Sequence, residues 1–122
     1  MSVLVVDDLP SFRRAVAAVI AVADGFELAG EAASGEEALG FIEERAVAMV
    51  LMDVNMPGIG GLEAARRIRR SHPGTVVVLL SVDDTEELPR DAKGIGAHYR
   101  HKDRFGPDEL EALWSDGGPA AS

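Results

Sequence analysis

The sequence contains no cysteine, so neither disulfide bonds nor thiolate metal sites contribute to its fold. No apolar run approaches the roughly 20 residues of a membrane-spanning helix, and the first residues lack the basic leader of an export signal. Basic residues are scarce: 12 lysines and arginines against 21 acids give a net charge of −9, which repels nucleic acids and anionic membranes. We therefore expect a soluble, cytoplasmic protein that binds neither DNA nor membranes.

The 122 residues suit one domain with a substantial core, which we place at 1–116, followed by a flexible tail or the start of a linker at 117–122. Short, mostly β-branched apolar runs alternate with stretches of helical periodicity. The apolar runs predict strands at 3–6, 26–32, 47–53, 75–80 and 97–100. Helices are expected to begin at Pro10, Ser34 and Leu62, after Thr85, and at Pro107. The fourth helix is the weakest, because a proline and two glycines fall within it.

Strands that alternate with helices in this way predict a parallel sheet with helices on both faces, since short right-handed crossovers leave few other arrangements. The expected fold is a doubly wound, flavodoxin-like α/β fold, (βα)5, with the strand order 2-1-3-4-5. In that order, the ligand crevice lies between the carboxyl ends of the first and third strands. Asp7 and Asp8 follow the first strand and Asp53 ends the third, so the three carboxylates are expected to converge in this crevice.

Three clustered carboxylates require a compensating charge. Two charges about 5 Å apart repel each other by roughly 3 kcal/mol at an effective dielectric constant near 20. A cation must therefore share the site, and an all-oxygen set of ligands suits Mg²⁺, with Mn²⁺ as a second choice. His72, His98 and His101 lack ligand spacing with these acids and are expected at the surface.

Further residues follow the acids in a fixed order along the chain. The ordered set is the acid pair Asp7-Asp8, Asp53 followed by Met56-Pro57-Gly58, the hydroxyl of Ser81, the aromatic Tyr99, and Lys102. This order resembles the receiver domain of two-component response regulators, and the resemblance spans Val3 to about Leu113. The amino-acid sequence of residues 35–39 and 53–58 is most similar to the NarL/FixJ class.

The resemblance implies that Asp53 accepts a phosphoryl group from a phosphohistidine of a sensor histidine kinase. It also implies that Mg²⁺ is bound by Asp8, Asp53 and the backbone carbonyl of Asn55, with Asp7 acting through a water molecule. Lys102 would neutralise charge on the transferred group, which is what phosphoryl transfer chiefly requires.

By the same resemblance, Ser81 would turn its hydroxyl toward the phosphoryl oxygens, and Tyr99 would swing into the vacated space. The remodelled surface would comprise the predicted fourth helix, the fifth strand and the last helix. The partner that binds this surface would be an output domain or a downstream protein, and a homodimer is an alternative. Whether the chain is a stand-alone receiver or part of a longer regulator is left open.

Two other functions compete with this interpretation. A small metal-dependent phosphatase or phosphotransferase could also form an aspartyl phosphate, with residues 53–55 as its motif. Such enzymes usually close a lid over the site, and the sequence has no insertion that would build one. An unphosphorylated interaction module would not need the acid pair and Lys102 together. We therefore expect a phosphoacceptor that assists its own chemistry, not a turnover enzyme acting on a separate substrate.

Overall fold

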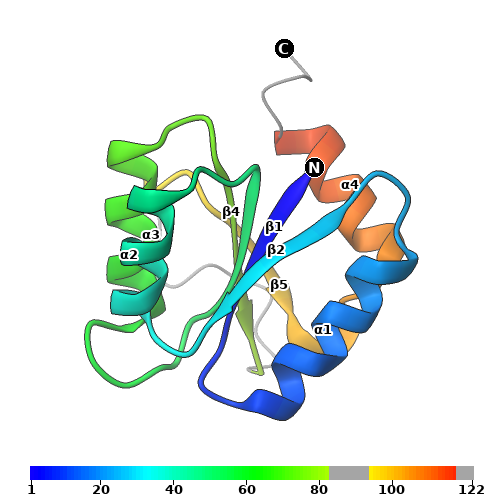
Figure 1. The fold of residues 1–122 in the computed structure, drawn as a ribbon, viewed down its shortest axis with the longest axis horizontal. Helices are drawn as coiled ribbons and strands as arrows, with labels where there is room; N and C mark the ends of the chain where they lie inside the picture. Colours follow the sequence, from blue (N-terminus) through cyan, green and yellow to red (C-terminus); the bar gives the residue numbers. More distant parts are fainter. Residues whose placement is uncertain (83–93, 118–122) are drawn as a thin grey trace.

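A computed structural model of the chain describes residues 1–82 and 94–117. It contains one parallel sheet in the strand order β2-β1-β3-β4-β5, which confirms the predicted topology (Figure 1). The fourth and fifth strands begin and end one residue later than predicted. The strands are β1 (Ser2–Val6), β2 (Glu27–Ala32), β3 (Met49–Asp53), β4 (Val76–Ser81) and β5 (His98–His101).

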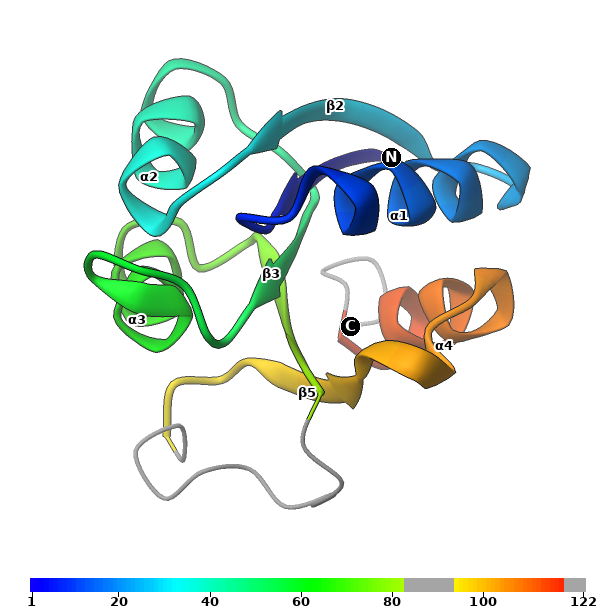
Figure 2. The same cartoon turned by 90° about the horizontal axis from the view of Figure 1, so that it is seen from below.

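Helices cover both faces of this sheet (Figure 2). One face carries α1 (Pro10–Val22) and α4 (Pro107–Gly117), and the other carries α2 (Gly35–Glu44) and α3 (Gly60–Ser71). A short 3-10 turn, η2 (Lys102–Arg104), connects β5 to α4. The helix predicted after Thr85 lies largely outside the described residues.

The core consists of two hydrophobic clusters, one on each face of the sheet. Because successive side chains of a strand point to opposite faces, each inner strand supplies both clusters. In β3, Val50 and Met52 join the cluster under α2 and α3, whereas Met49 and Leu51 join the cluster under α1 and α4. All of β3 is buried, including Asp53 at its end. The unbroken apolar run therefore reflects a central strand that is covered on both faces.

The start of α2 supports the loop between β3 and α3. Ser34 caps α2, since its Oγ accepts a hydrogen bond from the Glu37 N–H at 3.1 Å. Two residues after Ser34, Glu36 extends toward the loop, and its Oε1 accepts a hydrogen bond from the Ile59 N–H at 3.4 Å. Gly58 has a positive φ of 80°, which suits glycine in this turn. The loop that follows Asp53 is thus held from the neighbouring helix.

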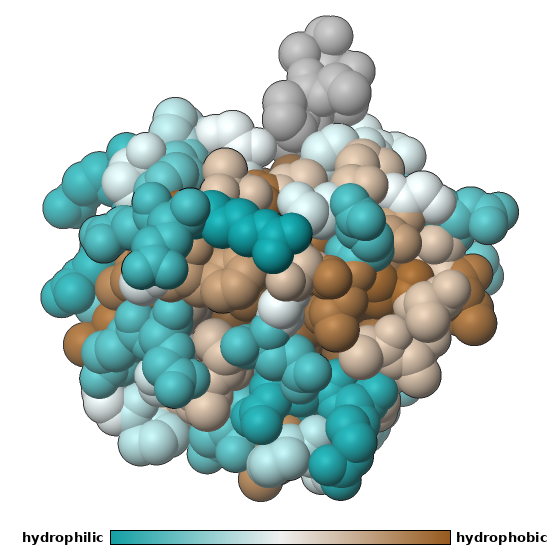
Figure 3. Space-filling view, viewed as in Figure 1, coloured by the Kyte–Doolittle hydropathy of each residue, from teal (hydrophilic) through white to brown (hydrophobic). Residues whose placement is uncertain are grey.

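The outer face of α1 is unusually apolar. No charged residue lies between Arg14 and Asp24, and Val22 is 70% exposed. Figure 3 shows hydrophobic surface over α1 and mostly hydrophilic surface over α2. Within the described parts of the chain, no helix is long and apolar enough to cross a membrane.

Candidate functional site

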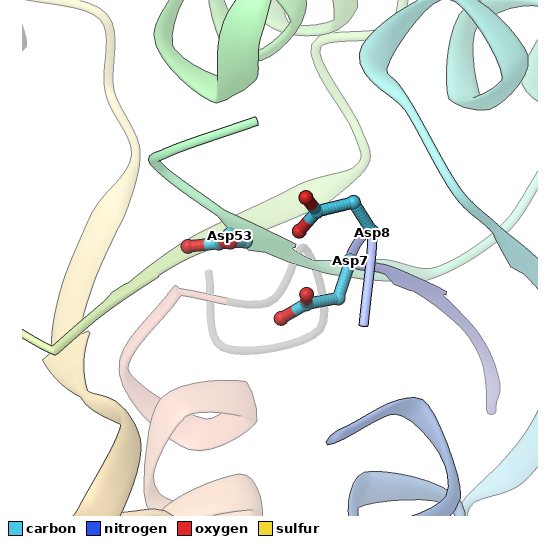
Figure 4. Close-up of side chains that lie close together, drawn as sticks. All are labelled: Asp7, Asp8 and Asp53. Carbon is cyan, nitrogen blue, oxygen red and sulfur yellow. The ribbon is translucent and has the colours of Figure 1, made fainter. Parts of the chain in front are cut away.

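Three carboxylates converge at the carboxyl ends of β1 and β3, as the sequence predicts. Asp7 and Asp8 come directly after β1, and Asp53 is the last residue of β3 (Figure 4). Each offers one carboxylate oxygen, and these three oxygens all lie within 4.8 Å of one another. Asp7 and Asp53 are buried, whereas Asp8 is exposed. The cluster therefore has a buried side and a side open to solvent.

Backbone hydrogen bonds fix the two buried acids. Oδ1 of Asp7 accepts from the Leu9 N–H at 2.9 Å, and Oδ1 of Asp53 accepts from the Asn55 N–H at 3.2 Å. In each case the N–H belongs to the second residue after the acid, which is the usual Asx-turn arrangement where a strand gives way to a loop. One oxygen of each carboxylate is thus engaged locally, and the other is directed elsewhere.

Lys102 binds those second oxygens. Its Nζ lies 2.7 Å from Oδ2 of Asp7 and 3.4 Å from Oδ2 of Asp53, and its side chain is 8% exposed. The predicted lysine is therefore in the site, and it is closer to Asp7 than to Asp53. A buried ion pair of this kind requires compensation for lost hydration, which the shared ammonium group gives to both acids.

Burial raises the pKa of the Asp53 carboxyl above its usual range, because the charged form loses hydration. The Asn55 N–H and the Lys102 ammonium act in the opposite direction, and the nearby Asp7 raises the pKa further. At Asp53, burial and the neighbouring acid therefore outweigh the local hydrogen bond and the ammonium group.

The donor set fits a small hard cation. It consists of carboxylate oxygens alone, it is closely spaced, and one of its members, Asp8, is open to water, which Mg²⁺ retains in its coordination shell. Within the described residues, the three acids are the group identified with metal-binding spacing. The backbone carbonyl of Asn55 as a further ligand stays a prediction.

The two residues predicted to switch lie on the adjoining strands. Ser81 is buried at the end of β4, and the Val54 N–H donates to the Leu80 carbonyl at 3.0 Å, which joins the ends of β3 and β4. Tyr99 pairs with Leu79 in the β4–β5 register and packs, partly buried, against the cluster under α2 and α3. Their roles as switch residues stay predictions.

Two residues on α1 support the site, and the sequence interpretation missed both. Phe12 has its ring centroid 4.3 Å from Nζ of Lys102, which is a cation–π contact. Arg13 donates from Nη1 to the Asp7 carbonyl at 2.6 Å and from Nε to Glu31 at 3.1 Å. Both residues come one helical turn after the acid pair, and a helix that begins at Pro10 directs its first turn back toward β1. This spacing was the feature of the sequence from which their place beside the site could have been predicted.

Comparison with known proteins gives a consistent result. The family model described as "Response regulator receiver domain" matches residues 3–114. Response regulator GacA of Pseudomonas viridiflava is 47% identical over 87 residues, which cover 71% of this chain and 41% of the relative. Response regulator UvrY of Escherichia coli K12 is 39% identical over 97 residues, which cover 80% of this chain and 44% of the relative. The chain thus spans less than half of the length of these curated relatives.

Solved structures agree with the sequence matches. The signal receiver domain of a NarL response regulator from Mycobacterium tuberculosis has a TM-score of 0.83 and 29% identity, covering 95% of this chain and 94% of that one. The response regulator domain of Thermotoga maritima CheB has a TM-score of 0.80 and 28% identity, covering 93% of this chain and 92% of that one.

Proposed function

The chain belongs to the response regulator receiver domain family, and from this premise we propose that Asp53 accepts a phosphoryl group from a phosphohistidine of a sensor histidine kinase. The observation that carries the proposal is the shared position of three acids and one ammonium group. Oxygens of Asp7, Asp8 and Asp53 lie within 4.8 Å of one another, and Nζ of Lys102 contacts two of these residues. Acids alone would make a metal site, and the buried lysine adds the positive charge that phosphoryl transfer requires.

The chemistry follows from the placement of these side chains. A carboxylate oxygen of Asp53 forms a bond to phosphorus while the bond between phosphorus and the kinase histidine breaks. Charge develops on the phosphoryl oxygens, and the Lys102 ammonium already lies at this end of the sheet to offset it. Asp8, Asp53 and the Asn55 carbonyl would hold Mg²⁺, with Asp7 acting through a water molecule, and the ion would supply the remaining charge neutralisation.

The signal then leaves through a change of surface. Ser81 contacts the new phosphoryl oxygens, and Tyr99 moves inward, since it is already packed partly against the core. The surface that changes comprises β5, α4 and the helix predicted after Thr85. Its partner is an output domain or a separate protein, and a second copy of the chain is another candidate. We place the protein in the cytoplasm, and we propose a phosphoacceptor and not a turnover enzyme.

Phosphorylation by a small donor tests the proposal. Incubation of the protein with acetyl phosphate and Mg²⁺ should add the mass of one phosphoryl group to the intact protein. The gain should disappear in Asp53→Asn and when EDTA removes the metal. Asp24→Asn is the matched control, because it removes an exposed acid outside the cluster.

Two outcomes would contradict the proposal. A mass gain that persists in Asp53→Asn would place the acceptor elsewhere. Steady hydrolysis of free phosphate esters, with many turnovers per protein molecule, would favour the competing phosphatase function.

A further inference from the structure

His101 lies between two parts of the site that are far apart in sequence. It is the last residue of β5, it pairs with Ser81 in the register of β4 and β5, and it directly precedes Lys102. Its side chain is 19% exposed. Figure 2 shows β5 leading directly into the turn before α4. The histidine therefore sits where the end of β4 meets the lysine-bearing turn η2.

Both ring nitrogens of His101 have backbone partners with fixed roles. Nδ1 accepts a hydrogen bond from the Asp103 N–H at 3.1 Å, because a backbone N–H can only donate. Nε2 lies 3.0 Å from the Val82 carbonyl oxygen, which can only accept. The two bonds together require a neutral ring that carries its proton on Nε2. Asp103 also places Oδ2 3.9 Å from Nδ1, but its side chain is 89% exposed, so this contact is weak.

We propose that His101 is a positioning residue for phosphoryl transfer: its Nε2-protonated ring joins the exit of β4 to the turn that carries Lys102. The inference rests on the proposed function and adds a residue that the sequence interpretation left at the surface. The bond to Asp103 caps η2. The bond to Val82 fixes that turn against the residue that follows Ser81.

The geometry of the lysine explains why such a connection matters. Nζ of Lys102 must stay near Asp53, 3.4 Å away in this structure, while β5, the strand that precedes it, is a half-buried edge strand of the sheet. Without the bond to Val82, the β5–η2 connection has one contact fewer with β4. Because electrostatic stabilisation depends on charges that are already in position, a displaced ammonium group lowers the rate.

Two substitutions separate the two bonds. His101→Asn retains an acceptor near the position of Nδ1, so it keeps the cap on η2 and loses the bond to Val82. His101→Gln retains a donor near the position of Nε2, so it keeps the bond to Val82 and loses the cap. His101→Ala loses both, and His72→Gln is the control for a histidine outside the site.

The experiment measures the rate of phosphorylation by acetyl phosphate with Mg²⁺, together with thermal unfolding followed by the fluorescence of Trp114. We expect His101→Asn and His101→Ala to phosphorylate about threefold to tenfold more slowly than the native protein, the factor that one net hydrogen bond represents. His101→Gln should recover a rate within about twofold of the native one. His101→Asn should lower the unfolding midpoint by only a few degrees and stay fully folded at the assay temperature, which separates positioning from folding.

Native rates in His101→Asn and His101→Ala would overturn the inference, and so would a rate in His101→Gln as low as that in His101→Ala. A second measurement does not depend on phosphorylation: long-range proton–nitrogen NMR spectra of the histidine rings near pH 7.5 should show His101 protonated on Nε2. A proton on Nδ1 would also overturn the inference. Failure of the native protein to gain a phosphoryl group would instead refute the proposed function, and the NMR result would still decide the ring geometry.

Discussion

The inner strands β3 and β4 and the edge strand β5 of the sheet are buried to different degrees. Every residue of β3 and β4 is buried, whereas every residue of β5 is only half-buried. Asp53 ends the tightly held β3, while Lys102 follows the loosely held β5. The two opposite charges of one site therefore come from regions of unlike local stability.

This difference in burial indicates which part of the site moves when the charge of the site changes. Segments with few buried apolar contacts open and shift at lower free-energy cost than core strands do. We therefore expect the acids to keep their positions, and we expect Lys102, with β5 and η2, to move. A receiver needs both properties, since the acceptor must be in place for chemistry and the output surface must change.

The largest predicted effect tests whether substitutions in the central strand β3 lower the stability more than substitutions in the edge strand β5. Leu51→Ala removes a fully buried side chain from β3 and should lower the free energy of unfolding by about 2–5 kcal/mol. Arg100→Ala removes the 3.5 Å contact with Glu109 on the half-exposed edge and should cost less than about 1 kcal/mol. Urea unfolding followed by Trp114 fluorescence measures both, and equal losses would contradict the contrast.

The next effect concerns the connection from β3 to α3. Gly61 is buried, and a Cβ atom there would overlap the backbone carbonyl of Asp53. Gly61→Ala should therefore displace the end of β3 and cost about 1–3 kcal/mol, with slower phosphorylation as well. Gly74→Ala is the control, because a Cβ atom at Gly74 meets no neighbour within 4 Å. If Gly61→Ala matched this control in both measurements, the end of β3 would not be tightly held.

A smaller effect concerns the charge of Asp53 and its contribution to the stability of the fold. Because folding raises the pKa of Asp53, the folded state binds a proton there more readily than the unfolded state, and the ionised group opposes folding above that pKa. In EDTA at pH 7, Asp53→Asn should therefore raise the unfolding midpoint by a few degrees. The gain should fade as the pH falls through the raised pKa and should be absent below about 4, the usual carboxyl range, where Asp53 is protonated in both states. A midpoint lowered at pH 7 would show that Lys102 overcompensates the acids.

The smallest effect is expected on the surface of α3. Hydrogen bonds from Arg67 and Arg66, at 2.9 and 2.7 Å, lower the pKa of the Glu63 carboxyl. Its contribution to stability is therefore present at neutral pH and is lost as the pH falls through the lowered pKa. Glu63→Gln should reduce the unfolding midpoint only slightly, and the difference should vanish in about 1 M salt. A difference that persists at high salt would contradict a screened surface pair.

The sequence predicted the fold and the meeting of the acids because both follow from periodicity and topology. The unbroken apolar run before Asp53 is typical of a central strand, and the confirmed strand order brings that strand's end beside Asp7 and Asp8. The boundaries of β4 and β5 were wrong by one residue, since Ser81 and His101 lack the apolar character that marks a strand.

Side-chain geometry could not be predicted in this way. Nothing in the spacing of the sequence says that Lys102 approaches Asp7 more closely than Asp53, or that the Phe12 ring lies against the ammonium group. His101 has no ligand spacing with the acids, and its partners are backbone atoms, which every residue possesses. Such contacts depend on rotamers that only the packed structure selects.

The strand order also has a consequence for the folding pathway. Asp7 and Lys102 are 95 positions apart, so on the ribosome the acids emerge well before the ammonium group that pairs with them. A nascent chain that contains β1 to β4 already carries Asp7, Asp8 and Asp53. We therefore expect the docking of β5 to be favoured by relief of charge repulsion as well as by apolar burial, so that completion of the sheet and completion of the site are one event.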